Sequence, residues 1–350
     1  MTSSEPLTVL LAKAWTAQTI EIDNAVEVAG AATARRRFRI SLAMWANGLR
    51  VIDEEGTPLE EVRRRARARC NVVGLERWGW VTVGDQSAGD GRRDGYGTSR
   101  GLGATSVLRP TRAGTTARHL WPETVQAVER RWRDRFGLVV VDAFRAEAAA
   151  FTEGMPWAVP EVHPGDGFRS HLIDGGSDDS GDRPLVILLG QALAALTVRA
   201  ETASSVSVAL GENLLRALED AAVTVRDLPT RTGLSKEAIS MAVNFSSRRS
   251  LARLGPGRSL ALTTGGAEAL ADHRTRVAGA AGSRGDGLRA ALEAVFSQPT
   301  ALAAGLEPPP GCWRGERPYL AQTRRLLANP IAALPRHPMV LHRGGWPDGS

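Results

Sequence analysis

The sequence predicts a mainly α-helical fold with small β-hairpins, in which one succession of elements occurs twice along the chain. Three observations lead to this prediction. Apolar residues recur at the spacing of helix faces through most of the chain. Two short pairs of strand-like segments each end at a threonine that opens a helix. A stretch rich in proline, glycine and acidic residues, 153–183, separates the two successions.

The composition is that of an ordinary globular protein. The chain has 350 residues, of which 43% are apolar and 23% are charged, enough for two domains. This excludes a collagen, a fully disordered tail and a disulfide-stapled miniprotein. A basic, apolar leader and an apolar run of membrane-spanning length are both missing, so we expect a soluble, cytoplasmic protein without membrane contact. The two cysteines lie far apart and the six histidines do not cluster, so no metal and no cofactor are expected.

Composition also predicts the domain boundaries. Segment 153–183 cannot bury enough apolar surface to offset its ordering entropy, so we interpret it as an acidic Gly/Pro-rich linker. It separates a first domain, residues 1–152, from a second, residues 184–278. A break rich in glycine and alanine near 278–287 then leads into residues 279–350, for which we expect a helix and an irregular, Pro-rich arm.

The second half shows the succession most clearly. Its order is a long apolar helix from Leu185, a helix near 212–218, a helix–turn–helix over 225–243, a β-hairpin over 251–263 and a final helix opened by Thr263. The turn is predicted at Gly233, because glycine readily takes the left-handed conformation that ends a helix.

The first half repeats this order. Its elements are a helix at 15–21, a long helix carrying Ile40 and Trp45, a helix capped by Thr57, a short helix at 71–78, strands at 80–83 and 106–109, and a final helix opened by Thr111. The path from the capping threonine to the final helix is longer than in the second half. The Gly-rich segment 84–103 between the two strands accounts for the excess.

A helix–turn–helix followed by a β-hairpin and a further helix is the arrangement of a winged helix. The steps after the two hairpins, Leu262-Thr263-Thr264-Gly265-Gly266 and Arg109-Pro110-Thr111-Arg112-Ala113-Gly114, resemble those of the MarR-type family of bacterial transcription regulators. The resemblance covers residues 40–137 and 185–278.

This resemblance implies DNA-binding regulation by a two-fold dimer that carries one winged helix per subunit. Two copies in one chain then imply two winged-helix domains forming a pseudo-dimer, as a monomer or within a homodimer. The chain departs from the family pattern at three places. The first recognition helix is short and contains Gly74, the first hairpin loop is long, and the linker and Pro-rich tail have no counterpart in the family.

Charge and residue types point to double-stranded DNA as the partner. The net charge of +6 is uneven, with +9 over residues 31–137 and −6 over 138–184. In a winged helix the second helix of the turn enters the major groove and the wing reaches the neighbouring backbone. Candidate contacts are Lys236, Ser240, Asn244, Arg248 and Arg258 in the second half, and Asn71, Arg77, Arg92, Arg93 and Arg100 in the first. Phosphate charge would come from Arg63, Arg64, Arg65, Arg67 and Arg69.

Tryptophan is unusually frequent, with nine residues against two tyrosines. Trp45, Trp121 and Trp132 are candidates to line a cleft that binds an apolar effector, and core packing is the other interpretation. We therefore predict a sequence-specific, ligand-responsive DNA-binding transcription regulator and not an enzyme, since the spacing supports no catalytic constellation. The alternative is a winged-helix protein-interaction module without DNA reading, which Gly74 in the short helix favours.

Overall fold

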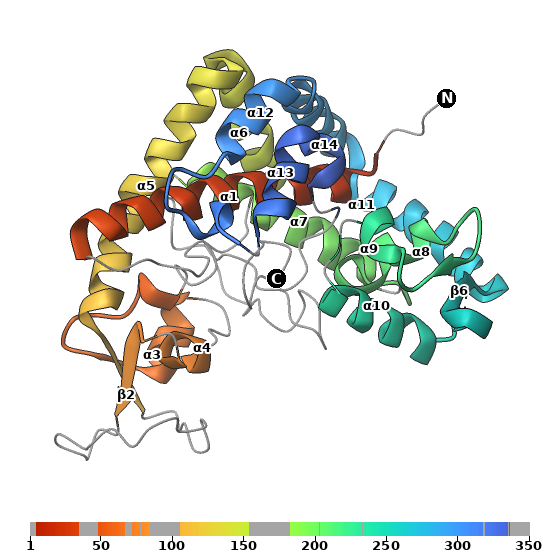
Figure 1. The fold of residues 1–350 in the computed structure, drawn as a ribbon, viewed down its shortest axis with the longest axis horizontal. Helices are drawn as coiled ribbons and strands as arrows, with labels where there is room; N and C mark the ends of the chain where they lie inside the picture. The colour runs from red at the N-terminus through yellow and green to blue at the C-terminus, as the bar shows by residue number, and fades with distance from the viewer. Residues whose placement is uncertain are drawn as a thin grey trace.

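The computed structural model of this chain describes residues 5–34, 48–66, 72–77, 79–84, 106–153, 183–202, 204–232, 234, 236–317, 319–334 and 336. Within these ranges the protein is mainly helical and has two small three-stranded antiparallel sheets, as the sequence predicts in outline (Figure 1). Several predicted features lie outside the described residues. They are the helix near Ile40 and Trp45, Asn71, Gly233, the loop with Arg92, Arg93 and Arg100, the side chains of Arg67 and Arg69, and nearly all of the linker.

The first half follows the predicted order. Its elements are α1 (Leu7–Ala34), β1 (Thr57–Pro58), α3 (Leu59–Ala66), α4 (Val72–Arg77), β2 (Val81–Gly84), β3 (Val107–Pro110), α5 (Arg112–Phe136) and α6 (Leu138–Phe151). The helix predicted at 15–21 is thus the middle of a much longer helix, α1. Both predicted strands are present, each displaced by one residue.

The second half repeats the succession. Its elements are α7 (Leu185–Glu201), a π-helical turn η1 (Val208–Glu212), α8 (Asn213–Ala217), β4 (Val223–Thr224), α9 (Leu228–Thr232), α10 (Lys236–Arg248), β5 (Ala252–Leu254), a 3-10 turn η2 (Pro256–Arg258), β6 (Ser259–Leu262) and α11 (Thr264–Phe296). The apolar helix α7, the consecutive helices α9 and α10 and the β5–β6 hairpin all fall where the sequence places them.

The C-terminal segment is more ordered than predicted. It begins with α12 (Pro299–Leu306), which packs on α1 and buries Leu302 and Leu306. The irregular arm was predicted after Pro308, but its described residues form a 3-10 turn η3 (Trp313–Gly315), α13 (Leu320–Ala328) and α14 (Pro330–Ala333). Irregularity was thus the wrong prediction for 320–333, where Leu326 is buried and Pro330 stands in the first turn of α14, at which the missing N–H costs nothing.

The two sheets share one topology. In the first, β3 lies between β1 and β2, and in the second, β6 lies between β4 and β5. Their registers also correspond: Leu108 pairs with Thr57 and Val83, as Leu260 pairs with Val223 and Leu254. The outer strands β1 and β4 were not predicted, because two residues are too few to show the alternation of a strand.

Thr57 does not cap a helix, so that prediction was wrong. The residue belongs to β1, where it pairs with Leu108, and its hydroxyl accepts the N–H of Asp53 at 2.9 Å. The helix begins two residues later at Leu59, whose N–H donates to the carbonyl of Ser106 at 2.8 Å. The residue predicted to cap the helix therefore belongs to β1, the third strand of the sheet.

The junction between hairpin and final helix is the same in both halves. The Thr111 hydroxyl donates to the Gly79 carbonyl at 2.6 Å and accepts the N–H of Gly114 at 3.2 Å. Thr263 makes the same pair of bonds with Ser250 at 2.7 Å and Gly266 at 2.9 Å. These contacts confirm both predicted N-caps, Thr111 and Thr263.

One hydrophobic core joins both halves. Helix α1 packs on α5 and α7, and α11 packs on α6 and α7, so segments far apart in sequence form a single helical body. Figure 1 shows this body in the middle of the molecule, with the α3–α4–β2 region at one end and the α10–β6 region at the other.

The break predicted near 278–287 is present as a kink in α11. This element extends from Thr264 to Phe296, and its helical path is interrupted at Gly282 (φ 54°, ψ −163°). The first half has a similar break at Gly137 (φ 92°), between α5 and α6. Among the helices of the described ranges, none combines the length and the apolar character that a bilayer crossing requires.

Candidate nucleic-acid interface

Helix α10 separates a buried face from an exposed polar row. Ala238, Ile239, Ala242 and Ser246 are buried, at the spacing of one helix face. The opposite face exposes the four predicted contacts Lys236, Ser240, Asn244 and Arg248. Because these residues follow one another at four-residue steps, they form a nearly continuous strip of hydrogen-bonding groups along the helix.

The hairpin after α10 adds further cations. Arg253 on β5 and Arg258 in the η2 turn are both exposed. Arg258 has a φ of 56° and follows Gly257, whose φ is 64°, so the hairpin ends in two left-handed residues. The carbonyl of Arg258 accepts the N–H of Val225 at 3.0 Å, which ties the turn to the start of the helix–turn–helix. This hydrogen bond therefore holds the backbone at the predicted wing contact, Arg258.

The end of α10 carries one more arginine that the sequence analysis did not single out. The Arg249 guanidinium lies over the Phe245 ring, 4.6 Å from its centroid, while the residue as a whole is exposed. This contact orients Arg249 beside Arg248. A pattern based on four-residue steps misses it because Arg249 lies one position off the strip.

The first half presents fewer of its predicted contacts. Arg77 is exposed at the end of α4, as predicted. Arg64 binds Glu61 through two bonds of 2.6 and 2.7 Å, and Arg65 binds Asp53 at 2.6 Å. The bond from Arg65 is the main reason that the pKa of the Asp53 carboxyl lies below its usual range. Two of the five arginines predicted to face phosphates therefore already have acidic partners.

The described tryptophans are core residues. Trp121 and Trp132 are both buried in α5, 5% and 0% exposed respectively. The Trp132 indole donates to Glu21 on α1 at 2.8 Å, and Arg135 binds the same carboxylate oxygen at 2.5 Å. Burial raises the pKa of Glu21, while Arg135 and Trp132 oppose this shift. An effector role for these side chains remains a prediction, and Trp45 lies outside the described residues.

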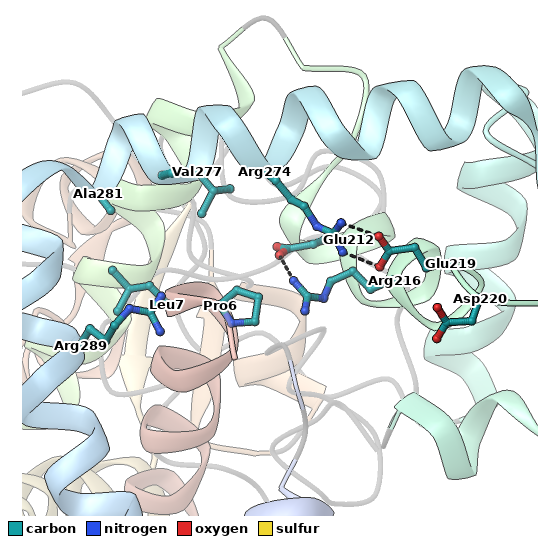
Figure 2. A pocket seen from close by; sticks show the side chains of 11 residues that line it. Pro6, Leu7, Glu212, Arg216, Glu219, Asp220, Arg274, Val277, Ala281 and Arg289 are labelled. Atoms are coloured by element: carbon teal, nitrogen blue, oxygen red, sulfur yellow. Dashed lines mark hydrogen bonds and ion pairs between the residues drawn. The ribbon is translucent and has the colours of Figure 1, made fainter. Parts of the chain in front are cut away.

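A cavity of about 620 Å³ lies elsewhere, between the start of α1, α8 and α11 (Figure 2). Pro6, Leu7, Val277 and Ala281 form its apolar wall, and charged side chains from residues 212–289 complete it. This cavity was not predicted. No sequence signal identifies it, because its lining comes from residues 6–7 and 212–289, which are distant in sequence.

Ion pairs cross the polar side of the cavity. Arg274 binds both carboxylate oxygens of Glu219, and Arg216 lies 3.9 Å from Glu212 (Figure 2). Glu212 also accepts the hydroxyl of Thr8 at 3.0 Å. Burial lowers the pKa of Arg216, with Glu212 opposing and Arg274 reinforcing that shift. Glu212 ends the π-helical turn η1, an irregularity that often marks functional sites.

The chain was compared with protein-family models, curated proteins and solved structures, and none of them matches it. The resemblance to MarR-type regulators therefore rests on the motifs quoted above and remains a prediction.

Proposed function

We propose that this protein is a sequence-specific DNA-binding transcription regulator in which two winged-helix domains form a pseudo-dimer within one chain. The repeated order of elements supports it, since each half has two short consecutive helices, a three-stranded sheet with the same strand order and a threonine-capped final helix. The shared helical body supports it too, because α1 and α7 pack on each other. A two-fold dimer of separate chains would use the corresponding contact between subunits.

The exposed strip on α10 is the observation that carries the proposal. A helix of 13 residues is long enough to lie in the major groove, and its strip offers an ammonium, a hydroxyl, an amide and a guanidinium. Lysine and arginine bind phosphates, and arginine also pairs with guanine. Asparagine pairs with adenine. Arg253 and Arg258 on the neighbouring hairpin extend the same cationic surface toward the DNA backbone.

Selection of binding sites from genomic fragments, followed by footprinting, tests this function directly. We expect protection of two half-sites about one helical turn apart. If about six phosphates are neutralised, the logarithm of the affinity should fall with the logarithm of the salt concentration with a slope near −5. Absence of binding to any duplex at low salt would refute the proposal, and sequence-blind binding would reduce it to nonspecific coating.

Charge reversal on α10 gives a sharper test. Arg248→Glu should lower the affinity for the selected duplex at least about tenfold, because it removes one phosphate or guanine contact and adds a repulsive charge. Arg324→Glu is the matched control, since Arg324 is an exposed arginine on α13, outside both helix–turn–helix regions. Equal affinities of the two variants would contradict a role for the strip.

We further propose that the regulator responds to a ligand bound in the cavity between α1, α8 and α11. Apolar walls and paired charges give that cavity the features of a small-molecule site. It contacts α8 next to the second helix–turn–helix and α1 in the shared body, so an occupant would bias their relative position. Ala281→Trp should fill the cavity and abolish any ligand effect on DNA affinity while leaving binding without ligand intact.

A protein-interaction module without DNA reading is the second candidate. Gly74 within α4 favours it, because a glycine inside a helix costs about 0.5–1 kcal/mol relative to alanine. Under this function, Lys236→Glu and Arg248→Glu would leave the affinity for DNA unchanged. The same binding measurements therefore separate the two candidates.

A further inference from the structure

We propose that the DNA target consists of two unlike half-sites, with base-specific readout concentrated in the half bound by the second helix–turn–helix. This inference rests on the proposed function and names the class of DNA that the protein takes. A dimer of identical chains reads a palindrome because both readers are the same. Here the two DNA-reading segments, or readers, belong to one chain: α3 with α4 in the first half and α9 with α10 in the second. Their side chains differ.

Hydrogen bonds fix which positions of the two readers correspond. Trp80 N–H donates to the Leu75 carbonyl at 2.9 Å, and Leu251 N–H donates to the Ser246 carbonyl at 2.9 Å. One residue further along each helix, Glu76 and Ser247 accept from Gly79 and Ser250 at 2.8 and 3.0 Å. Position 75 therefore corresponds to 246, and the following positions correspond in order.

This alignment leaves one shared contact at the reader surface. Arg77 corresponds to Arg248, and both are exposed. Glu76 corresponds to Ser247, so an anion stands where the second half has a hydroxyl. Position 73 is valine where the second half has Asn244, and valine has no hydrogen-bonding group. At this position the amide suited to adenine is thus present in the second half and not in the first.

The readers also differ in length. Ala66 on α3 and Thr232 on α9 occupy corresponding positions. Both are buried, and each lies nine positions after the first residue of the first strand of its sheet, β1 or β4. From these two residues, five residues lead to Val72 in the first half and ten lead to the corresponding Val243 in the second. The first half is therefore five residues shorter in the stretch that contains Lys236 and Ser240 in the second. These residues start the recognition helix, whose N-terminal part contacts base edges.

The first half still presents positive charge. Arg77, Arg109 and Arg112 are exposed at the end of α4, on β3 and at the start of α5. Arginines in such places bind phosphates, which position a protein on the duplex and carry no sequence information. The first half is therefore suited to holding the DNA, and the second half is suited to reading it.

The test starts from sites that the full chain selects from random duplexes. We expect conserved bases in one half-site and weak conservation in the other. Single base changes in the strong half should weaken binding roughly 5- to 150-fold, as broken base contacts do. Changes in the weak half should alter affinity by less than about threefold. A palindromic consensus with equal conservation in both halves would overturn this inference and leave the proposed function standing. Failure to select any duplex would refute the proposed function itself.

Two variants test which half of the protein binds the strong half-site and which binds the weak one. Asn244→Ala should relax base preference at one position of the strong half, with no change in the weak half. Arg77→Ala should weaken binding to all duplexes by a similar factor and make the salt slope shallower by about one. A base-specific effect of Arg77→Ala in the weak half, as strong as that of Asn244→Ala in the strong half, would contradict the proposed division.

Discussion

Helices α1 and α7 begin alike but pack differently. Each follows a proline whose carbonyl accepts the N–H groups of the third and fourth residues, and the sequences from Pro6 and from Pro184 both continue with five mostly aliphatic residues. α7 is buried almost entirely through apolar side chains. α1 is buried just as deeply but carries several charged and amide groups, namely Lys13, Gln18, Glu21, Asp23, Asn24 and Glu27.

The C-terminal segment explains three of these buried groups, Asp23, Asn24 and Glu27. The Arg314 guanidinium is 2% exposed, donates to Asn24 at 3.1 Å and lies 3.5 Å from Asp23. The backbone N–H of Trp313 donates to both carboxylate oxygens of Glu27, at 3.2 and 3.3 Å. Polar groups on α1 thus have partners that α7 lacks, because this segment occurs once in the chain. The repeat therefore loses symmetry where the C-terminal segment, which occurs once, packs against α1, one of the two equivalent helices α1 and α7.

Removing Arg314 tests this difference between α1 and α7, and we expect it to have the largest effect on the free energy of unfolding. Arg314→Ala leaves Asp23 buried beside Glu27 without its cationic neighbour, and losing one partner of a buried ion pair costs about 3–5 kcal/mol. Unfolding in urea, followed by circular dichroism, measures the loss. Arg317→Ala is the control, since Arg317 is exposed three residues further on and should cost less than about 0.5 kcal/mol. Equal losses would mean that the buried cluster contributes little to stability.

The order of elements was predictable because it depends on local signals. Thr111 and Thr263, with glycines three residues later, identify the start of each final helix, and apolar spacing identifies the helices themselves. The α10 strip was predictable for the same reason. Partners of buried charge were not, since Arg314 and Asp23 are distant in sequence and nothing local indicates that either is buried. The cavity was missed for this reason too: its walls meet only after both halves pack.

The second prediction concerns the starts of helices α5 and α11, where the two halves have the same structure. A methyl group at Gly114 would overlap the Trp80 carbonyl oxygen, and one at Gly266 would overlap that of Leu251. Both oxygens belong to backbone that is held by the threonine caps, so the clash has little room to relax. Gly114→Ala and Gly266→Ala should therefore each lower the free energy of unfolding by about 2–3 kcal/mol.

Gly265→Ala provides the matched control. An added methyl at Gly265 meets nothing within 4 Å, and alanine favours the helix by about 0.5–1 kcal/mol relative to glycine. Thermal unfolding should therefore show a lower midpoint for Gly266→Ala and an unchanged or higher one for its neighbour. If one of the two destabilising variants were tolerated, the junctions would differ in packing despite their matching hydrogen bonds.

The smallest expected effect concerns the residue that distinguishes α1 from α7 near their starts. Lys13 is 1% exposed and donates to both Glu5 oxygens at 2.6 and 2.7 Å, whereas Gln191 at the corresponding position accepts from Arg183 at 2.7 Å. Lys13→Gln makes the two helices more alike. It removes both the ion pair and the cost of burying an ammonium, and these terms oppose each other, so we expect a change of about 1 kcal/mol or less at pH 7.

The pH dependence of the free energy of unfolding distinguishes the ion pair of Lys13 from the cost of burying its ammonium group. Burial lowers the pKa of Lys13, with its bond to Glu5 opposing. The unfolded lysine titrates near a pKa of about 10.4, so between the two pKa values the unfolded chain binds more protons than the folded one. The free energy of unfolding should therefore rise with pH in that alkaline window relative to Lys13→Gln. Parallel curves for Lys13→Gln and the unaltered protein would show that burial does not penalise the ammonium.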